Sequence, residues 1–253
     1  MSTNSETKIN LLLQRTPAGT VMLTEWMNRH GYSGDLQHRY LKNGWLASVG
    51  YGAMKRAGDT ITLPGALYSL QAQAQMPVYI GGRSALQMQG LSHFLELYPK
   101  ETLIYVTGIA KLPSWFRNYK WETKPVVFHS SILPADAGLV SFADKTFSVQ
   151  ISGPVRAIME CLEQVPSGFD LQEAWQIMEG LNFLKAEEVQ KMLVQCGSVK
   201  VKRLFLFLAE KAGHAWVKHL DMNHITLGKG KRSIYPGGVF DRKYQITIQA
   251  DFS

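Results

Sequence analysis

The sequence predicts an α+β fold in two parts, residues 1–95 and residues 96–253. In the first part, a short amphipathic helix is followed directly by two β-type runs around a glycine-flanked turn. From residue 102, further β-type runs alternate with turns, and after Pro154 helical periodicity takes over. The sequence contains no extended Gly/Ser-rich or Pro-rich linker, no internal repeat and no low-complexity tract.

The composition indicates a globular protein without membrane or disulfide chemistry. Of the 253 residues, 45% are hydrophobic, and the formal net charge of +7 weakly favours an anionic partner. Cys161 and Cys196 have no Cys-x-x-Cys spacing, which indicates neither a zinc site nor a disulfide framework and fits a reducing cytoplasm. The first residues, MSTNSETK, lack the apolar region of a signal peptide, and no apolar run approaches the roughly 18 residues of a membrane span. We therefore expect a cytoplasmic protein.

Residues 33–43 form the most clearly marked helix of the first part. Ser33 is a good N-cap, because its hydroxyl can accept a hydrogen bond from a backbone N–H that the helix leaves unpaired. Asn43 and Gly44 suit the other end, because glycine adopts the left-handed conformation without a clash. At about 100° per residue, Leu36, Tyr40 and Leu41 share one side. Gln37 is expected on the flank, and the remaining polar side chains are expected to point away: Asp35, His38, Arg39 and Lys42.

The elements around this helix complete a recognisable order. We expect a helix over Ser5–Arg15, a β-type run over Thr20–Leu23 and a second helix from Thr24, its N-cap, to about His30. After the 33–43 helix, two runs read as a hairpin around Gly50-Tyr51-Gly52: residues 45–49 and residues 53–56. Helix, strand, helix, turn, helix and hairpin is the order of a winged helix-turn-helix. In an alternative register, Gly58-Asp59 is the tip of the wing and Thr60–Leu63 the return strand.

In such a fold, the 33–43 helix would enter a major groove of DNA and the wing would lie on the backbone. Gln37 and His38 are the candidate readers of base edges. Arg39 and Lys42 are candidates for base or phosphate contacts, or simply solvated charges, and Tyr51, Lys55 and Arg56 would anchor phosphates. Winged helices also dock proteins, so the pattern leaves that alternative open. Trp26 and Trp45 are expected in the core rather than stacked on bases.

The second half of the first part combines helices with a short strand. A helix is expected from Ala66 to Gln75, then a buried strand over Val78–Ile80, then a Gly81-Gly82-Arg83-Ser84 turn that opens a helix through Gln89. A glycine turn before a helix can bind an anion. This turn lacks the spacing of a phosphate-binding loop, so packing of the helix on the strand is favoured over a nucleotide site.

After residue 102 the predicted order is β-rich and then helical. Strands with turns between them are expected within residues 102–107, 121–129 and 140–151, and helices over residues 155–165, 171–181, 186–196 and 201–212. The last helix is nearly apolar all round, which predicts the buried centre of this part. Ile225–Leu227 and Tyr244–Ile248 are expected to pair as strands around the basic loop Gly228–Lys243. That loop could contact phosphate, but a solvated loop is favoured.

The sequence offers little catalytic chemistry. His214, His219 and His224 recur every five residues, which does not place them on one helix face, and no paired carboxylates lie nearby. No nucleophile elbow and no deaminase signature are present. We therefore expect no enzyme, no cofactor and no metal site. A nucleotide- or RNA-modifying enzyme that uses the Gly81-Gly82 turn and the basic loop is the less favoured alternative.

Several runs, in order, resemble one family: LLLQRTPAGTV, RHGYS, RYLKNGWL, VGYGAMKRAGD, GALYSLQAQ and PVYIGGRSALQMQGLSHFL. Together they resemble the AbiEi-like antitoxins of type IV toxin–antitoxin systems, most specifically over about residues 8–95. FSVQISGPVRAIMECLEQV is similar to the start of that family's antitoxin domain, with a looser pattern. The resemblance covers most of the chain.

The resemblance implies a function for each part. The N-terminal domain would bind inverted repeats in its own promoter as a winged helix and repress the operon. The C-terminal domain, 96–253, would counteract a nucleotidyltransferase toxin without necessarily forming a stable complex with it. No catalytic residue carries over. The family's DNA-contacting helix and wing correspond here to Ser33, Gln37, His38, Arg39, Lys42, Tyr51, Lys55 and Arg56.

Overall fold

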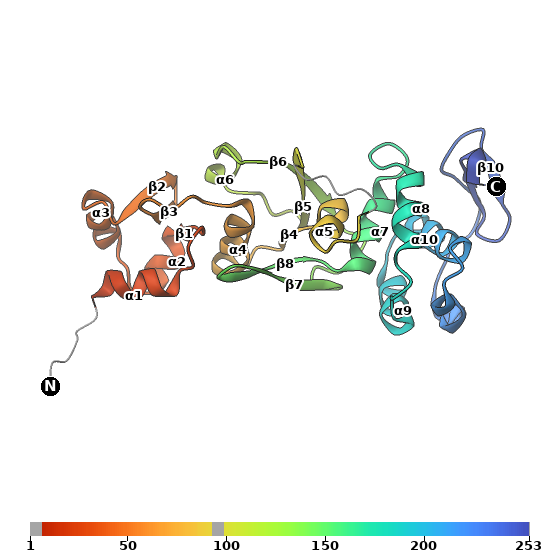
Figure 1. The fold of residues 1–253 in the computed structure, drawn as a ribbon, viewed down its shortest axis with the longest axis horizontal. Helices are drawn as coiled ribbons and strands as arrows, with labels where there is room; N and C mark the ends of the chain where they lie inside the picture. The colour runs from red at the N-terminus through yellow and green to blue at the C-terminus, as the bar shows by residue number, and fades with distance from the viewer. Residues whose placement is uncertain (1–6, 93–98, 253) are drawn as a thin grey trace.

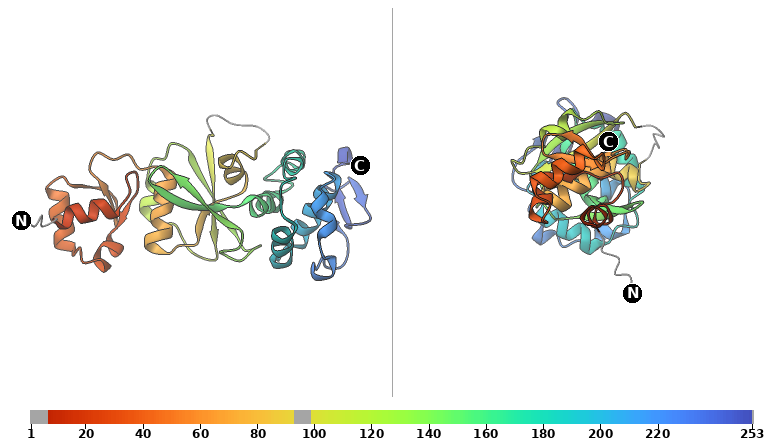
Figure 2. Two further views of the ribbon diagram at one scale, coloured as in Figure 1. Left: turned by 60° about the horizontal axis from the view of Figure 1, so that its bottom comes forward. Right: turned by 90° about the vertical axis from the view of Figure 1, so that its left-hand side faces the viewer.

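The computed structural model describes residues 7–92 and 99–252 as an elongated molecule. The winged part lies at one end, a five-stranded sheet occupies the middle, and a helical layer leads to a small sheet at the other end (Figure 1). The first and last segments of the chain are therefore far apart, as the left view of Figure 2 also shows. The expected α+β fold is confirmed.

The first six elements form the winged helix-turn-helix that the sequence predicts. They are α1 (Lys8–Arg15), β1 (Met22–Leu23), α2 (Thr24–Arg29), α3 (Gly34–Lys42), β2 (Leu46–Gly50) and β3 (Ala53–Arg56). The three strands make an antiparallel sheet in the order β1-β3-β2. The helices enclose a core of their own, which includes Leu12, Met27, Tyr40 and Leu46. Residues 5 and 6 of the expected first helix lie outside the described residues.

The hairpin follows the first of the two expected registers. Leu46 pairs with Arg56 and Ser48 with Met54, and the register shifts between Ser48 and Gly50. The alternative with Gly58-Asp59 as the tip is wrong, because residues 60–62 form no strand and α4 begins at Leu63. Thr24 is the first residue of α2 rather than its cap, and its N–H donates to the Gly52 carbonyl at 3.0 Å.

The central sheet draws its strands from both sides of residue 95. Its order is β6-β5-β4-β8-β7, with bounds Lys124–Ser130, Glu101–Thr107, Val78–Ile80, Phe147–Ser152 and Leu139–Asp144. β4 pairs antiparallel with β5 and parallel with β8. Helices α4 (Leu63–Ala74), α5 (Gly82–Met88) and α6 (Ser114–Asn118) accompany this sheet. The boundary expected at residue 95 falls in 93–98, outside the described residues, while the sheet joins the segments on either side of it.

Four helices cover the far end of the sheet. They are α7 (Pro154–Gln164), α8 (Leu171–Glu179), α9 (Ala186–Gln195) and α10 (Val199–Lys211). α7 packs against α5 and α10. Leu204, Phe205 and Leu208 of α10 are fully buried, which confirms that this apolar helix lies at the centre of the layer.

The chain ends in 3-10 turns and a small sheet. The turns are Ala215–His219, Met222–His224 and Ala250–Phe252, and the strands are β9 (Arg232–Ser233), β10 (Val239–Asp241) and β11 (Ile246–Ile248). β11 pairs antiparallel with β10 and parallel with β9. The expected strand over Ile225–Leu227 is wrong: two very short strands inside the basic loop take its place beside β11.

Candidate nucleic-acid interface

The exposed face of α3 carries three of the candidate contacts. The Ser33 hydroxyl accepts from the Leu36 N–H at 3.4 Å, so the expected N-cap is present. Tyr40 is buried, whereas His38, Arg39 and Lys42 are exposed. Within the described residues, neither Arg39 nor Lys42 forms an ion pair or a side-chain hydrogen bond. α3 lies at the end of the molecule away from the central sheet (Figure 1), so these cations face solvent.

Gln37 does not lie on an open flank, and the expectation that it reads base edges is wrong for this conformation. Only 2% of its surface is exposed. Its amide N–H groups donate to the Tyr32 carbonyl at 2.7 Å and to the Asn28 side-chain oxygen at 2.8 Å. These bonds join α3 to α2 and to the turn between them. Gln37 therefore fixes the angle between the two helices instead of facing solvent.

The wing supplies fewer free cations than the sequence suggests. The Tyr51 side chain, at the tip, is 94% exposed. The half-buried Arg56 donates to the Leu13 carbonyl at 2.6 Å, so it closes the C-terminal end of α1. Lys55 donates to the Asp59 carbonyl at 2.7 Å. One terminal nitrogen of Arg56 is thus used within the fold, and its role as a phosphate anchor stays a prediction.

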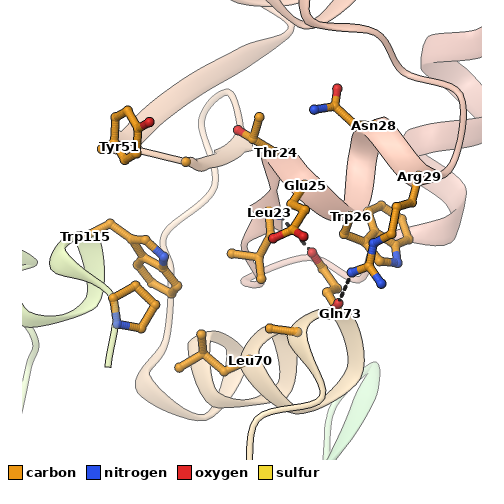
Figure 3. A pocket seen from close by; sticks show the side chains of 13 residues that line it. Leu23, Thr24, Glu25, Trp26, Asn28, Arg29, Tyr51, Leu70, Gln73 and Trp115 are labelled. Carbon is orange, nitrogen blue, oxygen red and sulfur yellow. Dashed lines mark hydrogen bonds between the residues drawn. The ribbon is translucent and has the colours of Figure 1, made fainter. Parts of the chain in front are cut away.

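The hairpin turn lies against the central part of the molecule. A Cβ at Gly50 would come within 2.8 Å of the Trp115 Cβ in α6, and the φ of Gly50 is +158°. Glycine is thus required at this close approach between the hairpin and α6. α6 therefore packs against the wing near Gly50, whereas the Tyr51 ring is exposed to solvent (Figure 3).

Of the two tryptophans expected in the core, Trp26 packs against it and Trp45 does not. Trp26 is half-buried and packs against both hydrophobic clusters of the molecule. Trp45, directly after α3, is 49% exposed. Sequence reasoning therefore missed Trp45 as a candidate contact beside the exposed face of α3. Its position between the Asn43-Gly44 turn and β2, an edge strand, was the available signal.

The Gly81-Gly82 turn already holds a carboxylate of this chain. The Gly82 N–H donates to Glu160 at 2.8 Å, and the Ser152 hydroxyl donates to the same oxygen at 2.7 Å. A Cβ at Gly81 would lie 2.5 Å from that oxygen. Packing rather than nucleotide binding therefore explains the turn.

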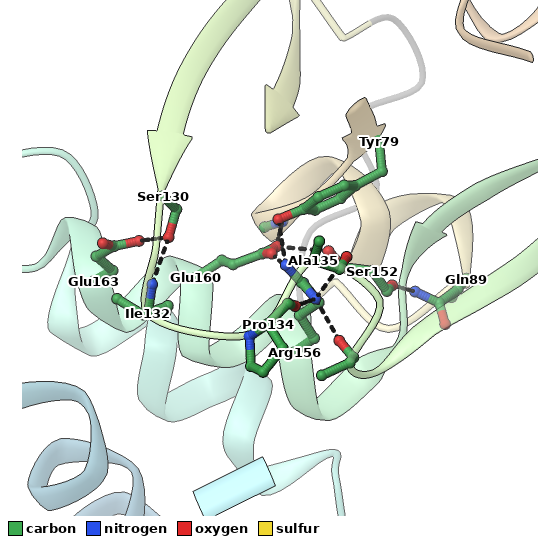
Figure 4. Close-up of polar contacts among 12 residues, drawn as sticks. Tyr79, Gln89, Ser130, Ile132, Pro134, Ala135, Ser152, Arg156, Glu160 and Glu163 are labelled. Carbon is green, nitrogen blue, oxygen red and sulfur yellow. Dashed lines mark hydrogen bonds and ion pairs between the residues drawn. The ribbon is translucent and has the colours of Figure 1, made fainter. Parts of the chain in front are cut away.

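Arg156 provides the positive partner of this buried carboxylate (Figure 4). Its Nε donates to Glu160 at 2.9 Å, one terminal nitrogen donates to the Tyr79 hydroxyl at 2.6 Å, and the other donates to the carbonyls of Pro134 and Ala137. Burial raises the pKa of Glu160, and the Arg156 charge opposes that shift. The cluster ties β4, β8, α5 and α7 together, which makes it structural.

A buried arginine holds the basic loop Gly228–Lys243 in place through hydrogen bonds. Arg203 of α10 is 2% exposed and donates to the carbonyls of Leu227, Gly228, Gly230 and Gln245. The loop's own cations are exposed: Lys229, Lys231, Arg232, Arg242 and Lys243. Lys243 pairs with Glu210, and the Lys231 ammonium lies 5.0 Å from the centre of the Phe240 ring.

The three histidines with five-residue spacing do not gather into one site. His214 is buried and bonds the Met178 carbonyl at 2.7 Å, whereas His224 bonds Asp221 at 2.7 Å on the surface. In the part of the chain that the structure describes, no group of three or more His, Cys, Asp or Glu side chains is placed to hold a metal ion.

Two models of protein families match this chain, one for each part. Residues 5–97 match the model of a transcriptional regulator, the AbiEi antitoxin N-terminal domain. Residues 100–249 match the model of a transcriptional regulator, AbiEi antitoxin, of type IV toxin–antitoxin systems. The chain belongs to this AbiEi family of antitoxins. The predicted family is thereby confirmed over nearly the whole sequence.

One solved structure supports the fold of this AbiEi chain. The crystal structure of the Rv2827c protein from Mycobacterium tuberculosis is similar with a TM-score of 0.59 and 17% identity, over 94% of this chain and 88% of that chain. No curated protein matches the sequence. Among the helices of residues 7–92 and 99–252, none combines the length and apolar character of a membrane span.

Proposed function

We propose that this AbiEi chain is a sequence-specific repressor that binds double-stranded DNA and also counteracts a nucleotidyltransferase toxin. One observation carries the DNA-binding part: Arg39 and Lys42, with His38 beside them, are exposed on α3 at the free end of a winged helix, and neither cation pairs with a described carboxylate. Membership in a family of transcriptional regulators supports the same conclusion.

The dimensions and charges of α3 suit a major groove. Its nine residues span about 13 Å, and the groove admits an α-helix. Exposed cations that meet phosphates release condensed counterions, which favours binding. Ser33 at the start of α3 and Tyr51 and Lys55 at the wing would contact the backbone, and His38 would donate to a base edge. Gln37 is not part of the proposed contact surface.

Repression of its own operon would require a symmetric arrangement of two protein copies on the DNA. A winged helix that reads inverted repeats requires two copies related by a two-fold axis, and the two copies could meet only when both are on DNA. The proposed operator therefore consists of inverted repeats in the promoter of the antitoxin–toxin operon. The counteraction of the toxin is assigned to the C-terminal part, without a requirement for a stable complex.

A matched pair of double variants tests the DNA-binding proposal. Arg39→Ala/Lys42→Ala removes two cations from α3, whereas Lys185→Ala/Lys191→Ala removes two exposed cations at α9, far from the winged part. In gel shifts with the promoter fragment at fixed salt, the α3 variant should bind more weakly by about 1–3 kcal/mol for each of the two side chains that reaches a base edge. The α9 variant should match the wild type. Equal affinity of all three proteins for the fragment would contradict the assignment of α3.

A protein-docking role for the winged part is the second candidate. The exposed aromatic side chains of Trp45 and Tyr51 favour it, because aromatic residues are enriched at protein interfaces. Salt distinguishes the two candidates. Binding through several phosphates falls steeply as salt rises, whereas docking of an apolar surface does not.

A further inference from the structure

The small sheet at the end of the chain has one face on the hydrophobic core and one face toward solvent. Ile246 and Ile248 of β11 are 0% and 2% exposed and belong to the core, whereas Thr247 between them is half-buried. Successive side chains of a strand point to opposite faces, so Thr247 lies on the solvent side. The sheet is at the opposite end of the molecule from the winged part (Figure 1).

Strand pairing brings an aromatic ring, two hydroxyl groups and two cations together on this solvent side, which we call the outer face. Thr247 lies in register with Phe240 of β10 and with Ser233 of β9. The Lys231 ammonium lies 5.0 Å from the centre of the Phe240 ring. Arg242 is exposed and follows β10 directly, in the turn at the rim of the outer face.

The Phe240 ring is available to a ligand. It is half-buried, and within the described residues it belongs to neither hydrophobic cluster. The group that lies over it is the ammonium of Lys231, an exposed and flexible side chain. A cation–π contact at an exposed site is weak, so another flat group can replace the ammonium over the ring.

The positive charge of the outer face is not cancelled by nearby acids. The basic loop holds five cations and one acidic residue, Asp241. Asp241 lies in register with the buried Ile246, and its carboxylate accepts from the Tyr244 N–H at 2.6 Å. In the part of the chain that the structure describes, neither Lys231 nor Arg242 forms an ion pair. The outer face therefore favours an anionic ligand.

The outer face is also held in shape from within. Arg203 donates to the Gly230 carbonyl at 2.7 Å, ahead of β9, and to the Gln245 carbonyl at 3.1 Å, ahead of β11. The Arg232 N–H donates to the same Gln245 carbonyl at 2.9 Å. β9 is therefore fixed beside β11 before any ligand arrives, which lowers the entropic cost of binding.

We propose that the outer face binds single-stranded RNA. A base would stack on Phe240, and phosphates would contact Lys231 and Arg242. Cations beside an accessible aromatic ring are typical of single-strand binding, because every unpaired base has a face that can stack. The Ser233 and Thr247 hydroxyls favour RNA over DNA, because they can hydrogen-bond the sugar 2′-hydroxyl, which both donates and accepts. The site shares no residue with the DNA contact proposed for α3.

Binding is tested with the full chain and a fluorescently labelled oligouridylate of about 12 nucleotides, by anisotropy at about 0.1 M salt. We expect saturable binding. Oligodeoxyuridylate of the same length lacks only the 2′-hydroxyl groups and should bind more weakly. Absence of saturable binding to the RNA, or equal affinity for the two oligonucleotides, would overturn the assignment to RNA.

A matched pair of phenylalanine variants tests the stacking contact. Phe240→Leu removes the ring from the outer face, whereas Phe183→Leu makes the same change at an exposed phenylalanine between α8 and α9. Phe240→Leu should weaken RNA binding about tenfold, because stacking of a base on an aromatic side chain contributes about that much to affinity. Phe183→Leu should match the wild type. Full RNA binding by Phe240→Leu would overturn the proposal.

The salt dependence tests the phosphate contacts. Each phosphate of a single strand that a protein neutralises contributes about 0.7 to the slope of log affinity against log salt. Lys231→Ala/Arg242→Ala should therefore have a slope that is shallower than the wild-type slope by about 1.4. Lys185→Ala/Lys191→Ala, which removes two exposed cations at α9, should keep the wild-type slope. Equal slopes for all three proteins would contradict the phosphate contacts.

The winged part provides the last control. Arg39→Ala/Lys42→Ala should leave RNA binding unchanged, and Phe240→Leu should leave operator binding unchanged. Failure of the RNA proposal and failure of the repressor proposal can therefore be distinguished. Loss of RNA binding in the α3 variant would place the RNA on the winged part and overturn the assignment to the outer face.

Discussion

Gln37 is the most buried polar residue of α3. The substitution Gln37→Met tests whether this side chain stabilises the fold or contacts DNA. Methionine has a similar shape but donates no hydrogen bond, so the buried Tyr32 carbonyl would be left without its donor, while Asn28 is exposed and can bond water. An unsatisfied buried acceptor costs about 1–3 kcal/mol. The Gln37 side-chain oxygen has no hydrogen-bond partner among the described residues, so its removal relieves part of that cost. We expect a net local destabilisation of about 1–2 kcal/mol.

Hydrogen exchange over α2 and α3 measures this effect. A loss of about 1.4 kcal/mol speeds exchange from locally opened states about tenfold. His38→Met is the matched control, because it makes the same kind of change at the exposed neighbouring position. It should leave exchange unchanged and weaken operator binding, and Gln37→Met should do the reverse under conditions where it stays folded. Normal exchange together with a tenfold loss of operator affinity in Gln37→Met would show that this side chain reads DNA.

Three further predictions concern the rest of the molecule. Arg156→Met leaves the Glu160 carboxylate buried without its counter-charge and should lower the free energy of unfolding by about 3–5 kcal/mol in urea titrations; a change under about 1 kcal/mol would refute the structural role of the pair. Arg203→Met should make the basic loop the first site of tryptic cleavage, and Arg203→Lys should not restore protection, because lysine lacks the planar fork that reaches several carbonyls. Lys243 lowers the pKa of Glu210, so that pair stabilises the fold above the ordinary carboxyl pKa and the effect is lost as pH falls through the lowered pKa. The stability difference between wild type and Glu210→Gln should therefore be a few tenths of a kcal/mol at about pH 7 and vanish in acid, and a difference that grows in acid would contradict this sign.

Local patterns were sufficient to predict the winged part. The Ser33 cap, the glycine-flanked turn and the apolar spacing of α3 act within a few residues of each other, so they can be recognised without tertiary information. The position of Gln37 could also have been found. It lies three residues before Tyr40 and four before Leu41, which places it on the buried side of the helix.

Long-range contacts account for what the sequence did not reveal. Arg56 bonds to Leu13, 43 residues away, so nothing near Arg56 distinguishes it from a solvated cation. Nothing in Val78–Ile80 indicates that this short strand joins β5 on one side and β8 on the other. The Gly81-Gly82 turn has the pattern of an anion-binding site. The group that it binds is the Glu160 side chain, 78 residues further along the chain.

The salt dependence of operator binding tests the central claim most directly. If Arg39 and Lys42 each neutralise a phosphate, the slope of log affinity against log salt for the double alanine variant should be shallower than the wild-type slope by about 2. The Lys185→Ala/Lys191→Ala variant should keep the wild-type slope. Identical slopes for the wild type and the Arg39/Lys42 variant would contradict the proposal that α3 lies against DNA.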